Sequence, residues 1–103
     1  MEILLGKQTR LLLRAHNGEE ALQLAEAYKP DLVLMDLKMP GMDGFEATQL
    51  ARKRWPDLRI IALTAYSQPE DERKALMAGC NAFIRKPVKK QELFETLNRV
   101  LRQ

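Results

Sequence analysis

The sequence contains a single cysteine, Cys80, among its 103 residues. One cysteine excludes an internal disulfide bond, so disulfides do not hold this fold together. An isolated thiol fits a reducing compartment such as the cytoplasm, where it most often serves as a small buried apolar side chain.

Long apolar runs and a strong excess of one charge are also missing. No run approaches the roughly 20 apolar residues of a membrane-spanning helix, and residues 1–5 are too short for a signal peptide. The net charge is only +3, and the basic clusters at residues 52–54 and 89–90 are explained as solvated helix ends. We therefore expect neither a membrane nor a nucleic acid as a partner of this chain.

The composition that remains is that of one globular domain, with 46% hydrophobic and 30% charged residues and no low-complexity segment. We expect strands at residues 9–15, 32–35, 59–64 and 81–85. We expect helices from Asn17 to the turn at Lys29 and Pro30, from near Gly44 to about Arg54, from residues 67–69 to Gly79, and from Gln91 to Leu101. Strands that alternate with helices predict a parallel sheet built through right-handed crossovers.

Several details of these elements follow from local signals. Asn17 and Glu20 form a capping-box-like pair, and Asp43 is placed to cap the second helix. The apolar faces of the helices are expected to include Tyr28, Leu50 and Phe94. Residues 1–7 fit either the last turns of a helix that ends at glycine or a short strand over residues 3–5.

The chain is organised around residues 31–44, in which an apolar run typical of a strand buried on both faces leads directly to Asp36. Ligands of open α/β sheets bind outside the carboxyl ends of the strands, and Asp36 is placed there. The alternative is that this carboxylate only caps a turn.

Two further polar residues fall at or just after neighbouring strand ends, Thr64 and Lys86. In a parallel sheet these ends share one edge, so a carboxylate, a hydroxyl group and an ammonium group should converge. A carboxylate that attacks a phosphoryl group needs cationic and hydroxyl donors to hold the phosphoryl oxygens. Taken singly, Thr64 fits a satisfied strand-end hydroxyl and Lys86 a solvated lysine; their joint placement favours phosphoryl chemistry.

The sequence resembles the receiver domains of two-component response regulators, in the style of those attached to hybrid sensor kinases. The resemblance rests on residues 31–36 (DLVLMD), 39–44 (MPGMDG), 62–65 (ALTA) and the Lys86-Pro87 pair, and it runs from about Arg10 to the C-terminus. It implies a flavodoxin-like, doubly wound α/β fold with the strand order 2-1-3-4-5, the order of the chemotaxis receiver.

The resemblance also implies a role for each matching residue. Asp36 is the expected phosphoacceptor, and the backbone carbonyl of Lys38 is an expected Mg²⁺ ligand. Thr64 and Lys86 are expected to bind the phosphoryl group, with the Lys86-Pro87 peptide bond in the cis form. Phe83 is expected at the aromatic switch position, where it would move with Thr64 when phosphorylation adds negative charge; the alternative for Phe83 is core packing.

The sequence departs from the family at its start. Receivers begin with a strand that ends in two adjacent acidic residues, which hold Mg²⁺, and no such strand precedes Asp36 here. We therefore expect residues 1–103 to be a single receiver-like domain, truncated at its N-terminus, with strand 1 missing or supplied by another chain. With Asp36 as the only carboxylate, Mg²⁺ binding should be weak or absent.

Loss of the first strand would leave unpaired backbone groups on the two strands that flank it. Three remedies are open: the strand at residues 9–15 pairs directly with the strand at residues 32–35, residues 1–5 refold as a strand, or a second chain fills the gap. We favour the last, which predicts a homo-oligomer formed by strand exchange or edge pairing.

The sequence thus supports a cytoplasmic receiver that takes a phosphoryl group onto Asp36 from a histidine kinase or phosphotransfer domain. Such a domain is a phosphoacceptor with, at most, self-catalysed phosphorylation and dephosphorylation, and is not an enzyme in the usual sense. The alternative is a phosphorylation-incompetent receiver that acts as an interaction or swapped-oligomer module. A flavin- or nucleotide-binding sheet is disfavoured because no Gly-rich or Ser/Thr-rich phosphate loop follows any strand.

Overall fold

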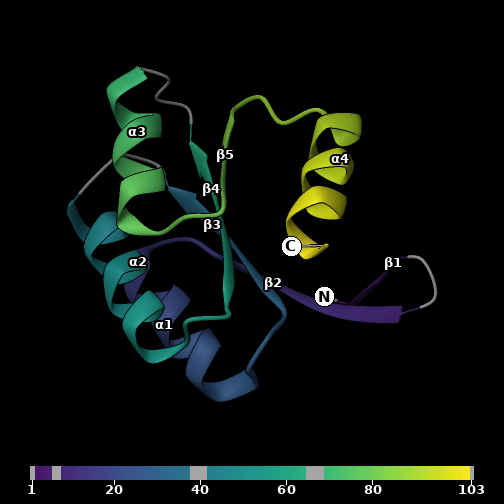
Figure 1. Ribbon diagram of the computed structural model, residues 1–103, viewed down its shortest axis with the longest axis horizontal. Helices are drawn as coiled ribbons and strands as arrows, with labels where there is room; N and C mark the ends of the chain where they lie inside the picture. The colour runs from purple at the N-terminus through teal and green to yellow at the C-terminus, as the bar shows by residue number, and fades with distance from the viewer. Residues whose placement is uncertain (1, 6–7, 38–41, 65–68, 103) are drawn as a thin grey trace.

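The computed structural model describes residues 2–5, 8–37, 42–64 and 69–102 (Figure 1). The elements are β1 (Glu2–Leu5), β2 (Gln8–Ala15), α1 (Gly18–Tyr28), β3 (Leu32–Leu37), α2 (Met42–Arg54), β4 (Arg59–Thr64), α3 (Pro69–Ala78), β5 (Ala82–Arg85) and α4 (Lys90–Leu101). From β2 onward, strands and helices alternate as the sequence predicts. No helix among these residues has the length and apolar character needed to cross a membrane.

The five strands form one sheet in the order β1-β2-β3-β4-β5. Strands β2 to β5 are parallel, and β1 joins the outer edge of β2 in the antiparallel direction. An α/β fold with a parallel four-stranded sheet and flanking helices confirms the predicted fold class.

Strand β2 lies directly beside β3, with Leu12 opposite Leu32 and Ala15 opposite Met35. The segment at residues 2–5 is the strand β1, so the helical alternative for it is wrong. Direct pairing of β2 with β3 and formation of a strand near the N-terminus, two of the three remedies considered above, therefore occur together in one chain. We expected a second chain to fill the place between β2 and β3, and this was wrong for the described sheet, because these strands hydrogen-bond to each other and leave no gap.

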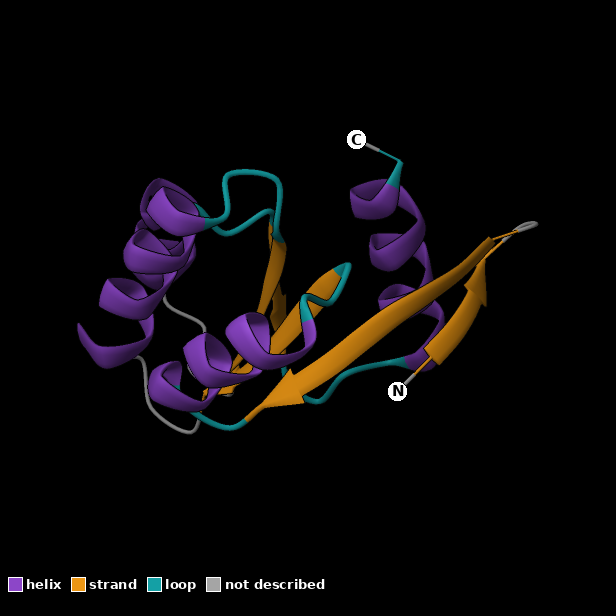
Figure 2. Cartoon of the chain, turned by 90° about the horizontal axis from the view of Figure 1, so that it is seen from below, coloured by secondary structure: helices purple, strands orange, loops and turns teal. Residues whose placement is uncertain are grey.

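The two faces of the sheet are covered unequally. Helices α1, α2 and α3 lie together on one face, and α4 alone covers the other (Figures 1 and 2). The core on the three-helix face includes Ala15, Ala25, Val33, Met35, Ala51, Ile60, Ala62 and Ala75. The core beneath α4 includes Leu12, Leu32, Leu34, Ile61, Leu63, Ile84, Leu97 and Val100. This alternation along the strands is the period of two that a sheet buried on both faces requires.

A single helix does not cover its whole face of the sheet. An apolar groove of about 420 Å³ remains between α4 and β2 to β4. Its lining consists of Leu12, Leu13, Arg14, Leu34, Leu63, Val88, Lys90, Leu93 and Phe94.

The start of α1 follows its predicted cap. The side chain of Asn17 accepts a hydrogen bond of 2.8 Å from the backbone N–H of Glu20. At the other end Lys29 adopts a left-handed conformation (φ 47°) and its N–H reaches the carbonyl of Ala25, which ends the helix before Pro30. The cap predicted for α2 is wrong, because this helix already begins at Met42 and Asp43 lies within its first turn.

Three side chains predicted to face the core are exposed instead. Tyr28 is 62%, Leu50 is 52% and Phe94 is 38% exposed. Leu50 lies about 100° around the helix from Ala51, outside the stripe by which α2 packs. Phe94 lines the groove that α4 leaves open. Thr48, by contrast, is 1% exposed and lies in the packed stripe of α2.

Candidate functional site

Asp36 lies near the carboxyl end of β3 and is 7% exposed. Both of its carboxylate oxygens accept hydrogen bonds from cations: Lys86 Nζ donates to Oδ1, and a guanidinium nitrogen of Arg14 donates to Oδ2. Turn capping does not account for these two ion pairs. The site therefore combines Arg14 from the end of β2, Asp36 from the end of β3 and Lys86, which follows β5.

The surroundings of Asp36 shift its pKa in opposing directions. Burial by itself raises the pKa, since it disfavours the charged form. The hydrogen bonds from Lys86 and Arg14, and the charges of these two residues, outweigh burial and hold the pKa of Asp36 below its ordinary value. The carboxylate is thus ionised at neutral pH, which is the state a nucleophile requires.

Lys86 follows β5 directly, and its side chain is 30% exposed. Its peptide bond to Pro87 is cis. Its backbone N–H donates a 2.8 Å hydrogen bond to the carbonyl of Thr64. A main-chain contact therefore fixes Lys86 at the end of β4, while its side chain reaches across to β3.

Thr64 is the last residue of β4 and is 1% exposed. It is opposite Leu37 on one side and Arg85 on the other, one position beyond the Asp36–Leu63 pair. The structure therefore places Asp36, Thr64 and Lys86 at the same edge of the sheet.

Phe83 lies on β5 opposite Ala62 and is partly buried against the core of the three-helix face. By the alternation of strand residues, Thr64 belongs to the same face of β4 as Ala62. Phe83 and Thr64 thus share one face of neighbouring strands. This placement accommodates the core-packing alternative for Phe83, and its switch role stays a prediction.

Arg14 is not among the residues that the sequence predicts for the site. This residue is the next to last of β2, and its position opposite Leu34 brings it to the edge where Asp36 lies. The available signal was a single cation near the carboxyl end of an apolar strand. It would have predicted a contact between Arg14 and Asp36 only if the direct pairing of β2 with β3 had been known.

The described residues do not fit a Mg²⁺ ion at Asp36. Among the side chains that the structure describes, which do not include those of residues 1–10, 37–44, 65–68 and 103, no three acidic, histidine or cysteine groups come together as a metal site would need. Both oxygens of Asp36 already accept from cations, whereas Mg²⁺ prefers free oxygen ligands. The Lys38 carbonyl, the other predicted ligand, lies outside the described residues.

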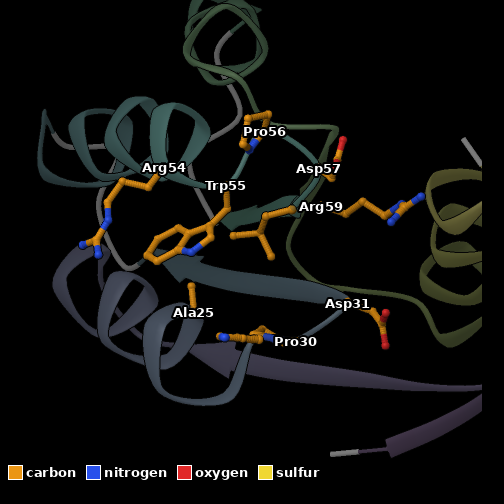
Figure 3. A pocket seen from close by; sticks show the side chains of 10 residues that line it. Ala25, Pro30, Asp31, Arg54, Trp55, Pro56, Asp57 and Arg59 are labelled. Carbon is orange, nitrogen blue, oxygen red and sulfur yellow. The ribbon is translucent and has the colours of Figure 1, made fainter.

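A second hollow, of about 570 Å³, lies at the opposite edge of the sheet (Figure 3). Two of its charged side chains, those of Asp31 and Arg59, have hydrogen-bond partners within the protein. Asp31 accepts a hydrogen bond of 2.8 Å from the N–H of Leu11, and Arg59 Nε donates to the carbonyl of Val100 at 3.1 Å. The hollow lies at the N-terminal ends of β3 and β4, at the end of the sheet opposite to Asp36, and we assign it no role in the site.

The parallel sheet with helices on both faces, and with a carboxylate and a lysine at its carboxyl edge, defines a flavodoxin-like α/β protein. The family model described as "Response regulator receiver domain" matches residues 2–98. This chain belongs to the response regulator receiver domain family.

Similar proteins carry names that agree with this family. The chain is 49% identical, over 80% of its length, to the uncharacterized transcriptional regulatory protein YhcZ of Bacillus subtilis. It is 36% identical over 95% of its length to the chemotaxis protein CheY of Halobacterium salinarum, of which it covers 82%. Among solved structures, a putative response regulator from Chloroflexus aurantiacus superposes with a TM-score of 0.79 at 25% identity, with 91% of this chain and 98% of that chain covered.

The extent of these matches differs. The chain spans 38% of the Bacillus subtilis regulator but most of the Halobacterium salinarum protein. What the matches share with this chain is therefore the receiver domain.

Proposed function

We propose that this chain is a phosphoacceptor that takes a phosphoryl group onto Asp36 from the phosphohistidine of a kinase or phosphotransfer domain, in the cytoplasm. The observation that carries the proposal is the contact between Lys86 Nζ and Asp36 Oδ1, which joins residues 50 positions apart in the sequence. Membership of the receiver family supports the same assignment. The chain accepts and releases the phosphoryl group and acts on no other substrate.

The chemistry requires little of the protein beyond position and charge. A lone pair of an Asp36 carboxylate oxygen forms a bond to phosphorus, and the P–N bond of the phosphohistidine breaks. The electron pair of that bond stays on the imidazole nitrogen, which takes up a proton from solvent. Lys86 then pairs with a phosphoryl oxygen, and the buried Thr64 hydroxyl donates to another as the edge of β4 adjusts.

The proposal is tested by exposing the chain to a small phosphodonor such as phosphoramidate and recording its intact mass. We expect an acid-labile gain of one phosphoryl group that is absent from Asp36→Asn. Lys86→Met should lower the rate by about ten- to a hundredfold, the size of a lost charge-assisted contact. A matched control, Lys74→Met, removes one exposed lysine from α3 and should leave the rate unchanged. An adduct that persists in Asp36→Asn would show that the acceptor is a different residue.

A phosphorylation-incompetent interaction module is the second candidate. Among the side chains that the structure describes, no group of three acidic, histidine or cysteine residues could hold a metal ion, and this favours it. The experiment above separates the two, because an incompetent domain gains no mass at any donor concentration.

Self-association through the edge of the sheet also stays a prediction. The place between β2 and β3 is closed, so strand exchange into that place is no longer needed. Edge pairing remains open to β1, which has a sheet neighbour only on its β2 side.

A further inference from the structure

Arg14 and Lys86 hold Asp36 from its two oxygens. Arg14 contacts Oδ2 and Lys86 contacts Oδ1, so one negative charge faces two positive charges. Asp36 has a 10% exposed side chain, whereas 58% of the Arg14 side chain is exposed. The carboxylate is therefore fixed in the protein, and the guanidinium reaches it from the solvent side.

This charge pattern is the reverse of a divalent cation site. A metal ion at Asp36 would lie beside two cations and would have to displace one of them from its oxygen. A phosphoryl group brings about two negative charges, which these same cations are placed to receive. The site is thus built for a tetrahedral oxyanion and not for a metal ion.

The position of Arg14 follows from the rearranged sheet. Because β2 pairs directly with β3, Arg14 is opposite Leu34 and two residues short of Asp36 along the neighbouring strand. The direct pairing of β2 with β3 therefore places the guanidinium group of Arg14 beside Asp36.

We propose that Arg14 replaces the divalent cation of this site, so that Asp36 is phosphorylated without a metal ion. The inference rests on the proposed phosphoacceptor function. Arg14 neutralises the donor's phosphoryl oxygens as they approach, and its planar fork binds two of them once the Asp36–phosphorus bond has formed.

No proton leaves Arg14 or Lys86 in this step. The carboxylate oxygen supplies the electron pair of the new O–P bond, and the leaving nitrogen of the donor keeps the electron pair of the broken P–N bond. The leaving nitrogen takes up a proton from solvent, and each cation exchanges its carboxylate contact for a phosphoryl oxygen, so charge and protons balance.

The test compares phosphorylation by phosphoramidate in excess chelator with phosphorylation in excess Mg²⁺. We expect the wild-type chain to react at similar rates in both. Arg14→Gln should lose about ten- to a hundredfold in rate in chelator, the effect of one charge-assisted contact, and Arg14→Lys should recover part of it. The control Arg99→Gln removes the same charge from the last turn of α4 and should react as the wild type does.

A second measurement does not depend on phosphorylation. Calorimetric titration of the wild-type chain with Mg²⁺ alone should give no saturable heat. Saturable binding of Mg²⁺ by the wild-type chain would overturn the inference.

The remaining outcomes separate this inference from the function on which it rests. Phosphorylation that occurs only with Mg²⁺, or that is as fast or faster in Arg14→Gln, overturns the inference and leaves the phosphoacceptor proposal standing. No Asp36-dependent adduct in the wild type or in any Arg14 variant, with or without Mg²⁺, overturns both.

Discussion

At the scale of single residues, the chain keeps a carboxylate charged within a largely buried position. Asp36 is 7% exposed, and burial of this kind favours the neutral acid. The two cations that hold its oxygens reverse that preference and lower its pKa. A lowered pKa in the folded state means that the charged carboxylate stabilises the fold.

The pH dependence of stability follows from this shift. Since the pKa of Asp36 is lower in the folded chain, its contribution is present above its ordinary value of about 3.9 and is lost as the pH falls through the folded value. We expect Asp36→Asn to lower the free energy of unfolding by about 1–3 kcal/mol at neutral pH, and by little at a pH well below the ordinary value. Urea unfolding of both proteins across this range measures the difference. A difference that does not change with pH would contradict the assignment.

At Cys80, unlike Asp36, the effect of burial on the pKa is larger than the effects of the neighbouring groups. It is 6% exposed, and burial raises the pKa of its thiol to about 11 against the smaller opposing effects of Thr48 and Arg52. Because the thiolate is the reactive form, we expect alkylation of the native chain at neutral pH to be very slow, and alkylation in denaturant to be fast. Labelling of the native chain as rapid as that of the unfolded chain would show that Cys80 is accessible.

At the scale of elements, one arginine connects the ends of several segments. Arg52 of α2 donates to the carbonyl of Leu58 before β4, to the carbonyl of Gly79 after α3 at 2.7 Å, and to Oδ1 of Asn81 before β5 at 2.9 Å. Gly79 has a φ of +119°, and a Cβ there would lie 3.3 Å from Nε of Arg52. A side chain at position 79 would therefore be strained by the backbone conformation and would press on Arg52.

Removal of this arginine tests whether these contacts stabilise the chain. We expect Arg52→Met to lower the free energy of unfolding by about 2–4 kcal/mol, since two partly buried backbone carbonyls and the side-chain oxygen of Asn81 lose this donor. Arg54→Met is the matched control: it loses an exposed ion pair with Glu26 and a contact over the Trp55 ring, together about 1 kcal/mol or less. Equal losses in the two variants would mean that the Arg52 contacts contribute nothing special.

The elements that the sequence predicted best are those with strong periodicity. The four parallel strands and four helices carry apolar runs or stripes bounded by Asn17, Pro30 and Gly79, which are local signals. The four residues of β1 carry too little pattern to distinguish a strand from the last turns of a helix. The exposure of Phe94 was not predictable locally, since it depends on α4 covering its face of the sheet alone.

Part of the candidate site could be predicted from the sequence and part could not. That Asp36, Thr64 and Lys86 lie at one edge was predictable, because all strands of a parallel sheet end at the same edge, whatever their order. The contact of Arg14 with Asp36 does need that knowledge, because it exists only through the direct pairing of β2 with β3. Local pattern fixes strands, whereas strand order is a property of the whole fold.

At the scale of the whole molecule, the way in which β2 joins the sheet determines both the chemistry at Asp36 and the strand that lies at one side of the sheet. Direct pairing of β2 with β3 closes the sheet, and the β1–β2 hairpin extends along the side that lies away from α1 to α3 (Figure 2). One of the two lateral strands of the described sheet is therefore β1, a short strand of four residues.

The unpaired side of β1 leads to a prediction about self-association. If β1 pairs with a second copy, we expect the average mass from light scattering to rise with protein concentration, because each molecule offers one such edge. A constant monomer mass across the concentration series would remove the predicted homo-oligomer.

The central claim is that the carboxylate of Asp36 itself carries the phosphoryl group. The most direct test is to treat the phosphorylated chain with borohydride, which reduces an acyl phosphate to the alcohol, and to locate the altered residue by tandem mass spectrometry. The account predicts a reduced side chain at position 36 and at no other aspartate. Reduction at another acidic residue, or none after treatment with phosphodonor, would contradict it.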